Sequence, residues 1–293
     1  MKHNIKCITL IVSAIIVVVT MMMSQYVYAQ QQLNLSYNTL SKSQTLDVFY
    51  PDEESAKYPV VIFLHGGSFF NGDKADFENE NKAVYLTNGY VYVGVNYRLF
   101  SEAPFPGALD DLKTAIRYLK ANHVALKIDP QSIYIVGHSA GANIASQHDL
   151  TSGLEALGDE EIKYPEQTSK VRGIVSLAGF YDLKTVIKNE NNKHFDVVVD
   201  KVKRYFKVAD QKYLIRANSY NFVKNSQTPL LLIHGIGDKI IATEETINYC
   251  QALKIRADND KVTCRILQNT SHHYSEFLKE VNQKIILEWL KNN

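Results

Sequence analysis

After Gln44 the chain alternates between short runs of β-branched residues and longer segments with helical periodicity. Several of the short runs are apolar throughout, which is typical of strands covered by helices on both faces. Alternating strands and helices predict a mostly parallel sheet with right-handed crossovers. The runs that we expect to be strands are TLDVFY, PVVIFL, VYVGVNY, SIYIVG, GIVSLA, PLLLIHG and VTCRIL.

Helical periodicity is clearest after Pro106 and in the stretch from Ser275 to Leu290, so a helix is predicted at each place. Two segments, 151–170 and 183–227, do not fit the alternation. Ligands of such sheets bind beyond the carboxyl ends of the strands, so these excursions are candidates for a small cap or lid. The alternative is a pair of solvated surface helices.

The composition favours one folded domain, which we expect to span residues 30–293. The chain has 293 residues, of which 45% are hydrophobic, and this is enough for one large core. Its 32 basic and 31 acidic side chains nearly balance, and no basic stripe with interleaved aromatic residues is present. Nucleic acid is therefore not an expected partner.

The first 29 residues have the pattern of a signal peptide. Lys2 and Lys6 precede an uncharged apolar run, 7–23, and Val27 and Ala29 supply the small residues that a signal peptidase requires. We therefore expect cleavage after Ala29 and a secreted or periplasmic protein. The alternative is a retained membrane anchor, because the run approaches the length that spans a bilayer.

Without that segment two cysteines remain, Cys250 and Cys264. We expect them to lie close together, because the helical segment around Cys250 leads directly into the strand that carries Cys264. An exported protein can join such a pair in a disulfide, and two buried free thiols are the alternative. Neither HExxH nor CxxC occurs, so no metal or other cofactor is expected.

The strongest chemical signal is IVGHSAG, residues 135–141, in which an apolar strand runs into Ser139 and then into helix-forming residues. This is the strand, turn and helix context of a nucleophile elbow. The glycines on either side of Ser139 permit a strained, closely packed turn. The amino terminus of the following helix favours negative charge beside the serine.

A second motif, FLHGGSFFNGDK, lies at the end of another apolar strand. Glycines in such a turn let backbone amides approach a substrate oxygen. Gly66 and Gly67, together with Ala140 of the elbow, are therefore the predicted donors of an oxyanion hole. His65 is expected to hold the loop by hydrogen bonding.

We expect the acid and the base of the mechanism in the loops that follow the last two predicted strands. Asp238 follows PLLLIHG, whereas its rival Asp182 comes early in the sheet order and resembles a helix cap. His272 and His273 follow VTCRIL, and either could be the base. The order of serine, acid and histidine is that of α/β-hydrolases.

The remaining histidines are expected to have no part in catalysis. His138 and His234 are motif neighbours with expected local hydrogen bonds, and three others are expected at the surface, namely His123, His148 and His194. Tyr97 and Arg98 are expected to have buried structural roles, and the alternative is that they support the catalytic residues from behind.

From about Leu46 onward the chain resembles the esterase and lipase branch of the α/β-hydrolases, which includes hormone-sensitive-lipase-like, kynurenine-formamidase-like and bacterial feruloyl-esterase-like enzymes. The matching stretches are HGGSFFNGDK, VNYRL, FPGALDDLKTAIRYLK, IDPQSIYIVGHSAGANIA, AGFYDL and LLIHGIGDK. The resemblance implies an α/β-hydrolase fold, the oxyanion hole named above, and a triad of Ser139, Asp238 and His272. It favours His272 over His273.

The chain departs from that branch at Ser68, where glycine is frequent, and in LFSEAPFP after Arg98. We expect ester hydrolysis through an acyl-enzyme without a cofactor. Short acyl chains are expected, because the segment 183–227 is too charged for an apolar lid. The alternatives are cleavage of an aryl formamide or short peptide by the same triad, and a catalytically idle binding module. The sequence specifies neither the substrate nor the oligomeric state.

Overall fold

The computed structural model describes residues 31–293 except 152–153, 155–156, 159–160 and 189–195. The predicted signal peptide, 1–29, and His194 therefore lie outside the described residues. Within the described part of the chain, no helix combines the length and apolar character needed to cross a membrane.

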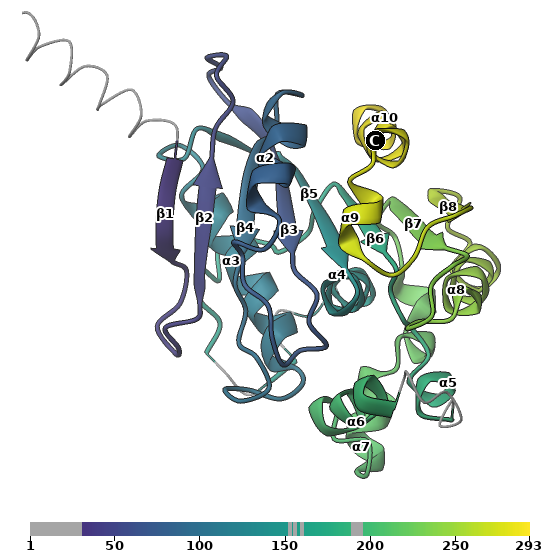
Figure 1. Cartoon of the computed structure of the whole chain (residues 1–293). Coiled ribbons are helices and arrows are strands. Elements are labelled where there is room, and N and C mark those ends of the chain that lie inside the picture. Colours follow the sequence, from purple (N-terminus) through teal and green to yellow (C-terminus); the bar gives the residue numbers. More distant parts are fainter. Residues whose placement is uncertain (1–30, 152–153, 155–156, 159–160, 189–195) are drawn as a thin grey trace, which may run out of the picture.

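A single sheet of eight strands runs through the described residues in the order β1-β2-β4-β3-β5-β6-β7-β8 (Figure 1). β2 is antiparallel to both β1 and β4, and the other neighbours are parallel. All the predicted runs form strands. The strands are β1 (Gln31–Ser36), β2 (Thr45–Phe49), β3 (Tyr58–Leu64), β4 (Val91–Val95), β5 (Ile128–His138), β6 (Gly173–Leu177), β7 (Leu230–Gly235) and β8 (Val262–Leu267).

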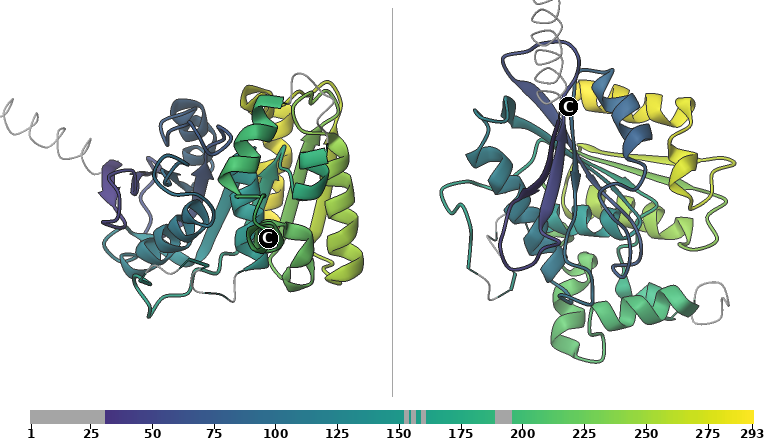
Figure 2. Two further views of the ribbon diagram at one scale, coloured as in Figure 1. Left: turned by 90° about the horizontal axis from the view of Figure 1, so that it is seen from below. Right: turned by 60° about the vertical axis from the view of Figure 1, so that its left-hand side comes forward.

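Helices cover both faces of the sheet (Figure 2), and two buried apolar clusters lie between them. One cluster joins the sheet to α3 (Gly107–Ala121), α4 (Ala140–Leu150) and α8 (Thr243–Arg256). The other joins it to α2 (Glu78–Leu86), α9 (Tyr274–Phe277) and α10 (Glu280–Asn292). Strands that are apolar on both faces are explained by these two layers.

The carboxyl-terminal helix differs from the prediction, because the stretch from Ser275 to Leu290 is not one helix. It is divided between α9 and α10 at Leu278 and Lys279, where Lys279 has an extended ψ of 138°. The side-chain amide of Asn282 donates to the carbonyl of Glu276 over 2.8 Å, and that of Gln283 donates to the carbonyl of Phe277 over 2.9 Å. These bonds satisfy carbonyl groups at the end of α9 that a continuous helix would have bonded internally.

β1 is the strand that the sequence analysis did not predict. Its sequence, QQLNLS, is polar and largely exposed, and it pairs only at the edge of the sheet with β2. An edge strand needs no continuous apolar run, so the signal used for the other strands is absent.

Helix α4 is buried along its whole length, and the expected surface position of His148 is therefore wrong. The described parts of both excursions cover this helix. His148 Nε2 donates to the carbonyl of Ser169 over 2.9 Å, and Gln147 donates to the carbonyl of Ala217. His123 is half-buried, with Nδ1 2.9 Å from the carbonyl of Lys120.

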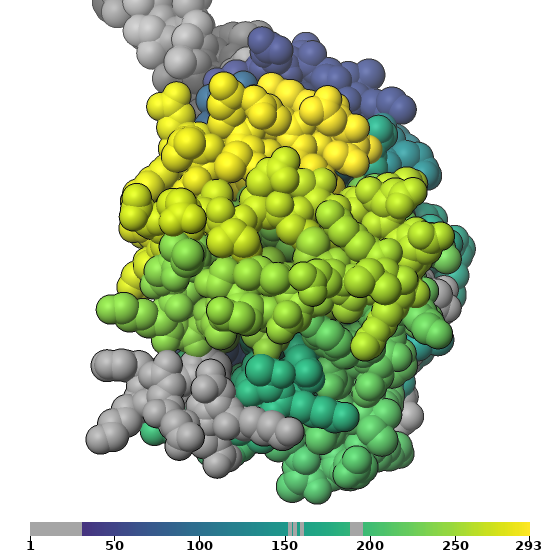
Figure 3. Space-filling model, turned by 90° about the vertical axis from the view of Figure 1, so that its right-hand side faces the viewer, coloured from purple at the N-terminus to yellow at the C-terminus, as the bar shows by residue number. Residues whose placement is uncertain are grey.

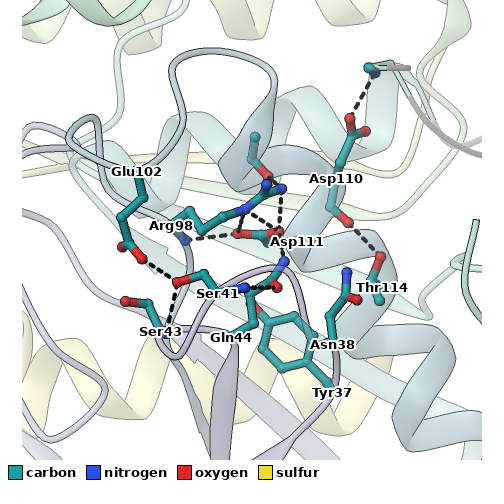
Figure 4. Close-up of polar contacts among 12 residues, drawn as sticks. Tyr37, Asn38, Ser41, Ser43, Gln44, Arg98, Glu102, Asp110, Asp111 and Thr114 are labelled. Carbon is teal, nitrogen blue, oxygen red and sulfur yellow. Dashed lines mark hydrogen bonds and ion pairs between the residues drawn. The ribbon is translucent and has the colours of Figure 1, made fainter. Parts of the chain in front are cut away.

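A buried polar network joins the turn between β1 and β2 to helix α3 (Figure 4). The Arg98 guanidinium forms an ion pair with Asp111, with Nη2 2.8 Å from Oδ1, and the amide of Gln44 donates to the same carboxylate. Tyr97 stacks on His65 and donates its hydroxyl hydrogen to the His65 carbonyl over 2.9 Å. Tyr97 and Arg98 are both buried, as expected.

The cysteines lie close together, as predicted, and form a disulfide between α8 and β8 with Cα atoms 6.5 Å apart. Figure 3 shows the face of the molecule on which α8, β8 and α10 form a continuous surface.

The segment 183–227 contains α5 (Leu183–Lys188), α6 (Asp196–Tyr205), α7 (Gln211–Ala217) and two short 3₁₀ turns, η1 (Ser219–Asn221) and η2 (Val223–Asn225). In Figure 1 α5, α6 and α7 lie together beyond the end of the sheet toward which the arrowheads of β3 and β5 point.

Candidate active site

The nucleophile elbow is a tight connection between β5 and α4. Ser139 separates the two elements and has φ 55° and ψ −113°, a conformation that is costly for a residue with a side chain. A Cβ at Gly137 would collide with the carbonyl of Gly141, and a Cβ at Gly141 would collide with that of Leu64. The two glycines therefore permit the turn that presents Ser139 beyond the end of β5.

The structure brings Ser139, His272 and Asp238 together in a chain of hydrogen bonds. Ser139 Oγ lies 3.0 Å from His272 Nε2, and His272 Nδ1 lies 2.7 Å from Asp238 Oδ2. A carboxylate can only accept, so Nδ1 carries the hydrogen and Nε2 is left to accept the serine proton. The side chains come from three loops, after β5, β7 and β8.

Four donors hold the Asp238 carboxylate. Oδ1 accepts from the backbone amides of Ile240 and Ile241, each over 2.8 Å, and Oδ2 accepts from His234 Nε2 over 3.0 Å as well as from His272. Burial by itself raises the pKa of Asp238, but the hydrogen bonds from His234 and His272 outweigh it and hold the pKa well below the usual range. The carboxylate therefore stays ionised at neutral pH.

His273 does not contact the serine or the acid. It is exposed and stands before the first residue of α9. Asp182 also lies away from the chain of hydrogen bonds. Its carboxylate accepts from the backbone amide of Lys184 over 3.0 Å and from the hydroxyl of Thr185 over 3.1 Å, so it caps α5 as the sequence indicated.

The HGG loop lies beside the serine because β3 and β5 are neighbours, with Leu64 in register with Gly137. Gly67 has φ 107°, and a Cβ there would collide with the carbonyl of Asn71, so the turn requires glycine. An added Cβ at Gly66 would stand 3.3 Å from the Ser139 Cβ. Within the described residues, the amides of Gly66, Gly67 and Ala140 have no hydrogen-bond acceptor.

The histidines next to the motifs hold this arrangement together. His65 Nδ1 lies 2.8 Å from the carbonyl of Gly66, which supports the expected role in the loop. His138 Nε2 lies 2.8 Å from the carbonyl of His272 and thereby ties the loop of the base to the elbow. Burial and the neighbouring His272 lower the pKa of His138 to about 3, so it is neutral. His234 bonds locally, to Asp238 of the same motif, as expected. His138 differs from the expected local bonding, because its partner His272 is 134 residues away in the sequence.

Helix α6 packs against the loop that follows the HGG motif. Phe69 stacks on Tyr205 with ring centroids 4.0 Å apart, and Phe180 and Phe206 meet Phe69 edge-on at 6.1 and 5.3 Å. All four rings are buried. Arg204 lies over the stacked rings of Phe70 and Phe100. The segment 183–227 is thus attached directly to the loop that carries Gly66 and Gly67.

No cluster of three or more potential metal-ligating side chains occurs in the part of the chain that the structure describes.

Comparison with known proteins places this chain in a family. The family model described as BD-FAE matches residues 46–253. Esterase LipQ of Mycobacterium tuberculosis is 25% identical over 265 residues, which are 89% of this chain and 61% of that protein. Isoprenylcysteine alpha-carbonyl methylesterase ICME of Arabidopsis thaliana is 24% identical over 214 residues, which are 71% of this chain and 49% of that protein. The chain therefore spans about half to three-fifths of the length of these relatives.

Solved structures show the same fold. A truncated carbohydrate esterase from gut microbiota has a TM-score of 0.76 and 23% identity over 89% of this chain and 95% of that chain. Esterase Est2 of Thermogutta terrifontis, in its propionate-bound form, has a TM-score of 0.70 and 17% identity over 90% of this chain and 94% of that chain. The predicted α/β-hydrolase fold is confirmed.

Proposed function

The chain belongs to the BD-FAE family, in the esterase and lipase branch of the α/β-hydrolases, and from this premise we propose that it hydrolyses small-molecule carboxylic esters through an acyl-enzyme on Ser139. The observation that carries the proposal is the continuous chain from Asp238 through His272 to Ser139, with contacts of 2.7 and 3.0 Å.

In the first step His272 Nε2 accepts the Ser139 proton as Oγ attacks the ester carbonyl. Asp238 keeps the imidazole in the tautomer that can accept this proton and stabilises the imidazolium that forms. The amides of Gly66, Gly67 and Ala140 donate to the developing oxyanion. The imidazolium then returns its proton to the alcohol oxygen, which leaves.

In the second step a water molecule loses a proton to His272 and attacks the acyl carbonyl. The proton returns to Ser139 Oγ as the acid is released, so the enzyme is regenerated without a cofactor.

We propose that the acyl group is short. The rings of Phe69, Phe180, Tyr205 and Phe206 fill the space between the HGG loop and α6. The exposed side chains of α6 are mostly charged, apart from Val197, whereas a lipase lid presents a broad apolar surface to lipid. p-Nitrophenyl acetate and butyrate should therefore be turned over faster than the dodecanoate. A rate that rises with chain length, and rises again at an oil interface, would contradict this proposal.

We also propose that the protein is exported, with residues 1–29 removed as a signal peptide. The disulfide between Cys250 and Cys264 supports export, because such bonds persist in oxidising compartments. Amino-terminal sequencing of the protein recovered from its native compartment tests the cleavage site. A mature chain that begins at residue 30 supports the proposal, and an intact amino terminus in the membrane fraction supports the anchor instead.

The decisive experiment combines labelling by a fluorophosphonate with turnover of p-nitrophenyl acetate. The unaltered protein should be labelled at Ser139 and turn over the ester. Ser139→Ala should lose the label and about five powers of ten in kcat while it keeps its fold by circular dichroism. A folded, unaltered protein that is neither labelled nor active would be the idle binding module.

A further inference from the structure

A pocket of about 300 Å³ opens between the HGG loop and the loop of the base. Its lining includes Gly66, Gly67 and His272 of the candidate site, together with Asp76, Phe77 and Tyr274. In an acyl-enzyme mechanism His272 gives its proton to the departing alcohol oxygen, so that oxygen must lie beside Nε2. A pocket that borders His272 is therefore placed to hold the alcohol part of the ester.

Phe77 is an unusual residue for its position in the fold. It stands at the amino-terminal cap of α2 with φ 56°, makes no side-chain capping bond, and is 41% exposed. Asparagine, aspartate or serine would cap the helix, and asparagine tolerates a left-handed backbone far better than an aromatic residue does. A large, partly exposed ring on a left-handed backbone, with no capping bond, costs stability locally, and such costs collect at binding sites.

The ring of Phe77 is nevertheless held in place. It lies 4.9 Å from the ring of Tyr274, which in turn lies 4.9 Å from the ring of Phe63. Tyr274 is buried, and its hydroxyl donates to Asn81 over 2.6 Å. Phe77 is thus the exposed end of a rigid row of aromatic rings, and its free face is available to another flat apolar group.

The charge of the pocket narrows the choice of ligand. Asp76 is the acidic residue of the lining, which contains neither lysine nor arginine among the described residues. The neighbouring Lys74 is buried and directed to Asp47, with Nζ 2.7 Å from Oδ2. A negatively charged alcohol would therefore meet a carboxylate, with no lysine or arginine among the described lining residues to offset it.

We propose that Phe77 is the platform of an alcohol-side subsite, and that this subsite selects esters of ring-bearing alcohols without negative charge. The inference rests on the proposed function, since it assumes that Ser139 is acylated. It adds what the triad does not specify, namely which half of the substrate this pocket recognises and by which residue.

The test compares benzyl acetate with methyl acetate, which form the same acetyl-enzyme and have alcohols of similar acidity. Phe77→Asn should lower the ratio of their kcat/KM values about tenfold, which corresponds to the loss of one aromatic contact. Phe77→Tyr keeps the ring face and should keep the ratio. Phe77→Asn should stay folded by circular dichroism, because asparagine tolerates the left-handed backbone of this position, so the lost ratio cannot be attributed to unfolding.

Tyr164→Asn is the matched control. Tyr164 is also a partly exposed aromatic residue with positive φ, 54°, but it packs on Tyr118 near the end of α3 that is remote from the triad. This variant should leave the benzyl to methyl ratio unchanged. An unchanged ratio in Phe77→Asn, or an equal loss in Tyr164→Asn, would overturn the proposal. So would a Phe77→Asn effect on the ratio of benzyl butyrate to benzyl acetate, because the pocket would then hold the acyl part.

The charge argument has its own test. Wild-type protein should prefer 4-(acetoxymethyl)benzamide to 4-(acetoxymethyl)benzoate, and Asp76→Asn should reduce that preference about threefold. Asp260→Asn changes the net charge equally, next to the amino-terminal end of β8, and should leave the preference unchanged. Failure of the proposed function is distinguishable from failure of the subsite, since the former abolishes labelling and turnover of every ester, whereas the latter leaves both intact and insensitive to Phe77 and Asp76.

Discussion

Replacing Asp238 with asparagine tests the triad through its hydrogen-bond geometry. Oδ1 accepts from two backbone amides, those of Ile240 and Ile241. The carbonyl oxygen of an asparagine must take this place, because an NH₂ group there would face two donors. The NH₂ group would then occupy the position of Oδ2, opposite His234 Nε2 and His272 Nδ1.

This placement reverses the tautomer of the base. His272 would have to accept at Nδ1 and carry its hydrogen on Nε2, so it could no longer accept the Ser139 proton. The new NH₂ group would also face the hydrogen on His234 Nε2. His234 cannot easily change its tautomer to avoid this, because Nε2 also lies 3.1 Å from the carbonyl of Ile241 and Nδ1 lies 2.7 Å from the Thr246 hydroxyl. Loss of the correct tautomer in a serine triad costs about 10⁴ in kcat, or roughly 5 kcal/mol.

The assay is steady-state turnover of p-nitrophenyl acetate by Asp238→Asn and by Asp182→Asn. Asp182 is the matched control, since it was the rival acid and serves as a helix cap outside the triad. Its variant should keep kcat within about twofold and lose about 1 kcal/mol of stability at most. A folded Asp238→Asn protein with more than a tenth of the wild-type rate would refute the tautomer argument. A large loss of kcat in Asp182→Asn would identify Asp182 as the acid.

Other perturbations have equally definite outcomes. His272→Ala should lose nearly as much activity as removal of the serine, whereas His273→Ala should retain a substantial fraction; p-nitrophenyl acetate assays that gave the reverse would identify the base as His273. The disulfide closes a loop with a sequence separation of 14, so Cys250→Ala/Cys264→Ala should lower the free energy of unfolding by about 3 kcal/mol. Urea titration of the variant and of the unreduced wild-type protein would measure this difference. Burial lowers the pKa of His148 from 6.5 to about 3. The neutral imidazole therefore stabilises the folded state fully above pH 6.5, and this stabilisation is lost as the pH falls toward 3. His148→Gln should reduce the stability lost between pH 7 and pH 5 by about 2 kcal/mol. Equal losses in His148→Gln and the wild type would show that this histidine is not the titrating group.

The sequence predicted the central strands because burial on both faces of a sheet demands runs such as PVVIFL and PLLLIHG. It predicted the place of the candidate site for a related reason. A tight turn between a strand and a helix requires glycine at fixed places, and GHSAG satisfies that steric demand locally. β1 lacks such a signal, since an edge strand with polar side chains is stabilised by pairing with β2 and not by its own composition.

Only the tertiary structure decided questions that depend on partners distant in the sequence. His148 is buried because the described parts of 151–170 and 183–227 cover α4. The local sequence AGANIASQHDL gives no signal that remote segments will pack on this helix. Likewise His272 and His273 are chemically identical neighbours in one loop. Their difference arises from direction, since the backbone places one imidazole between Ser139 and Asp238 and leaves the other exposed. Local sequence determines which groups a loop carries, whereas the packing of remote segments determines where those groups point.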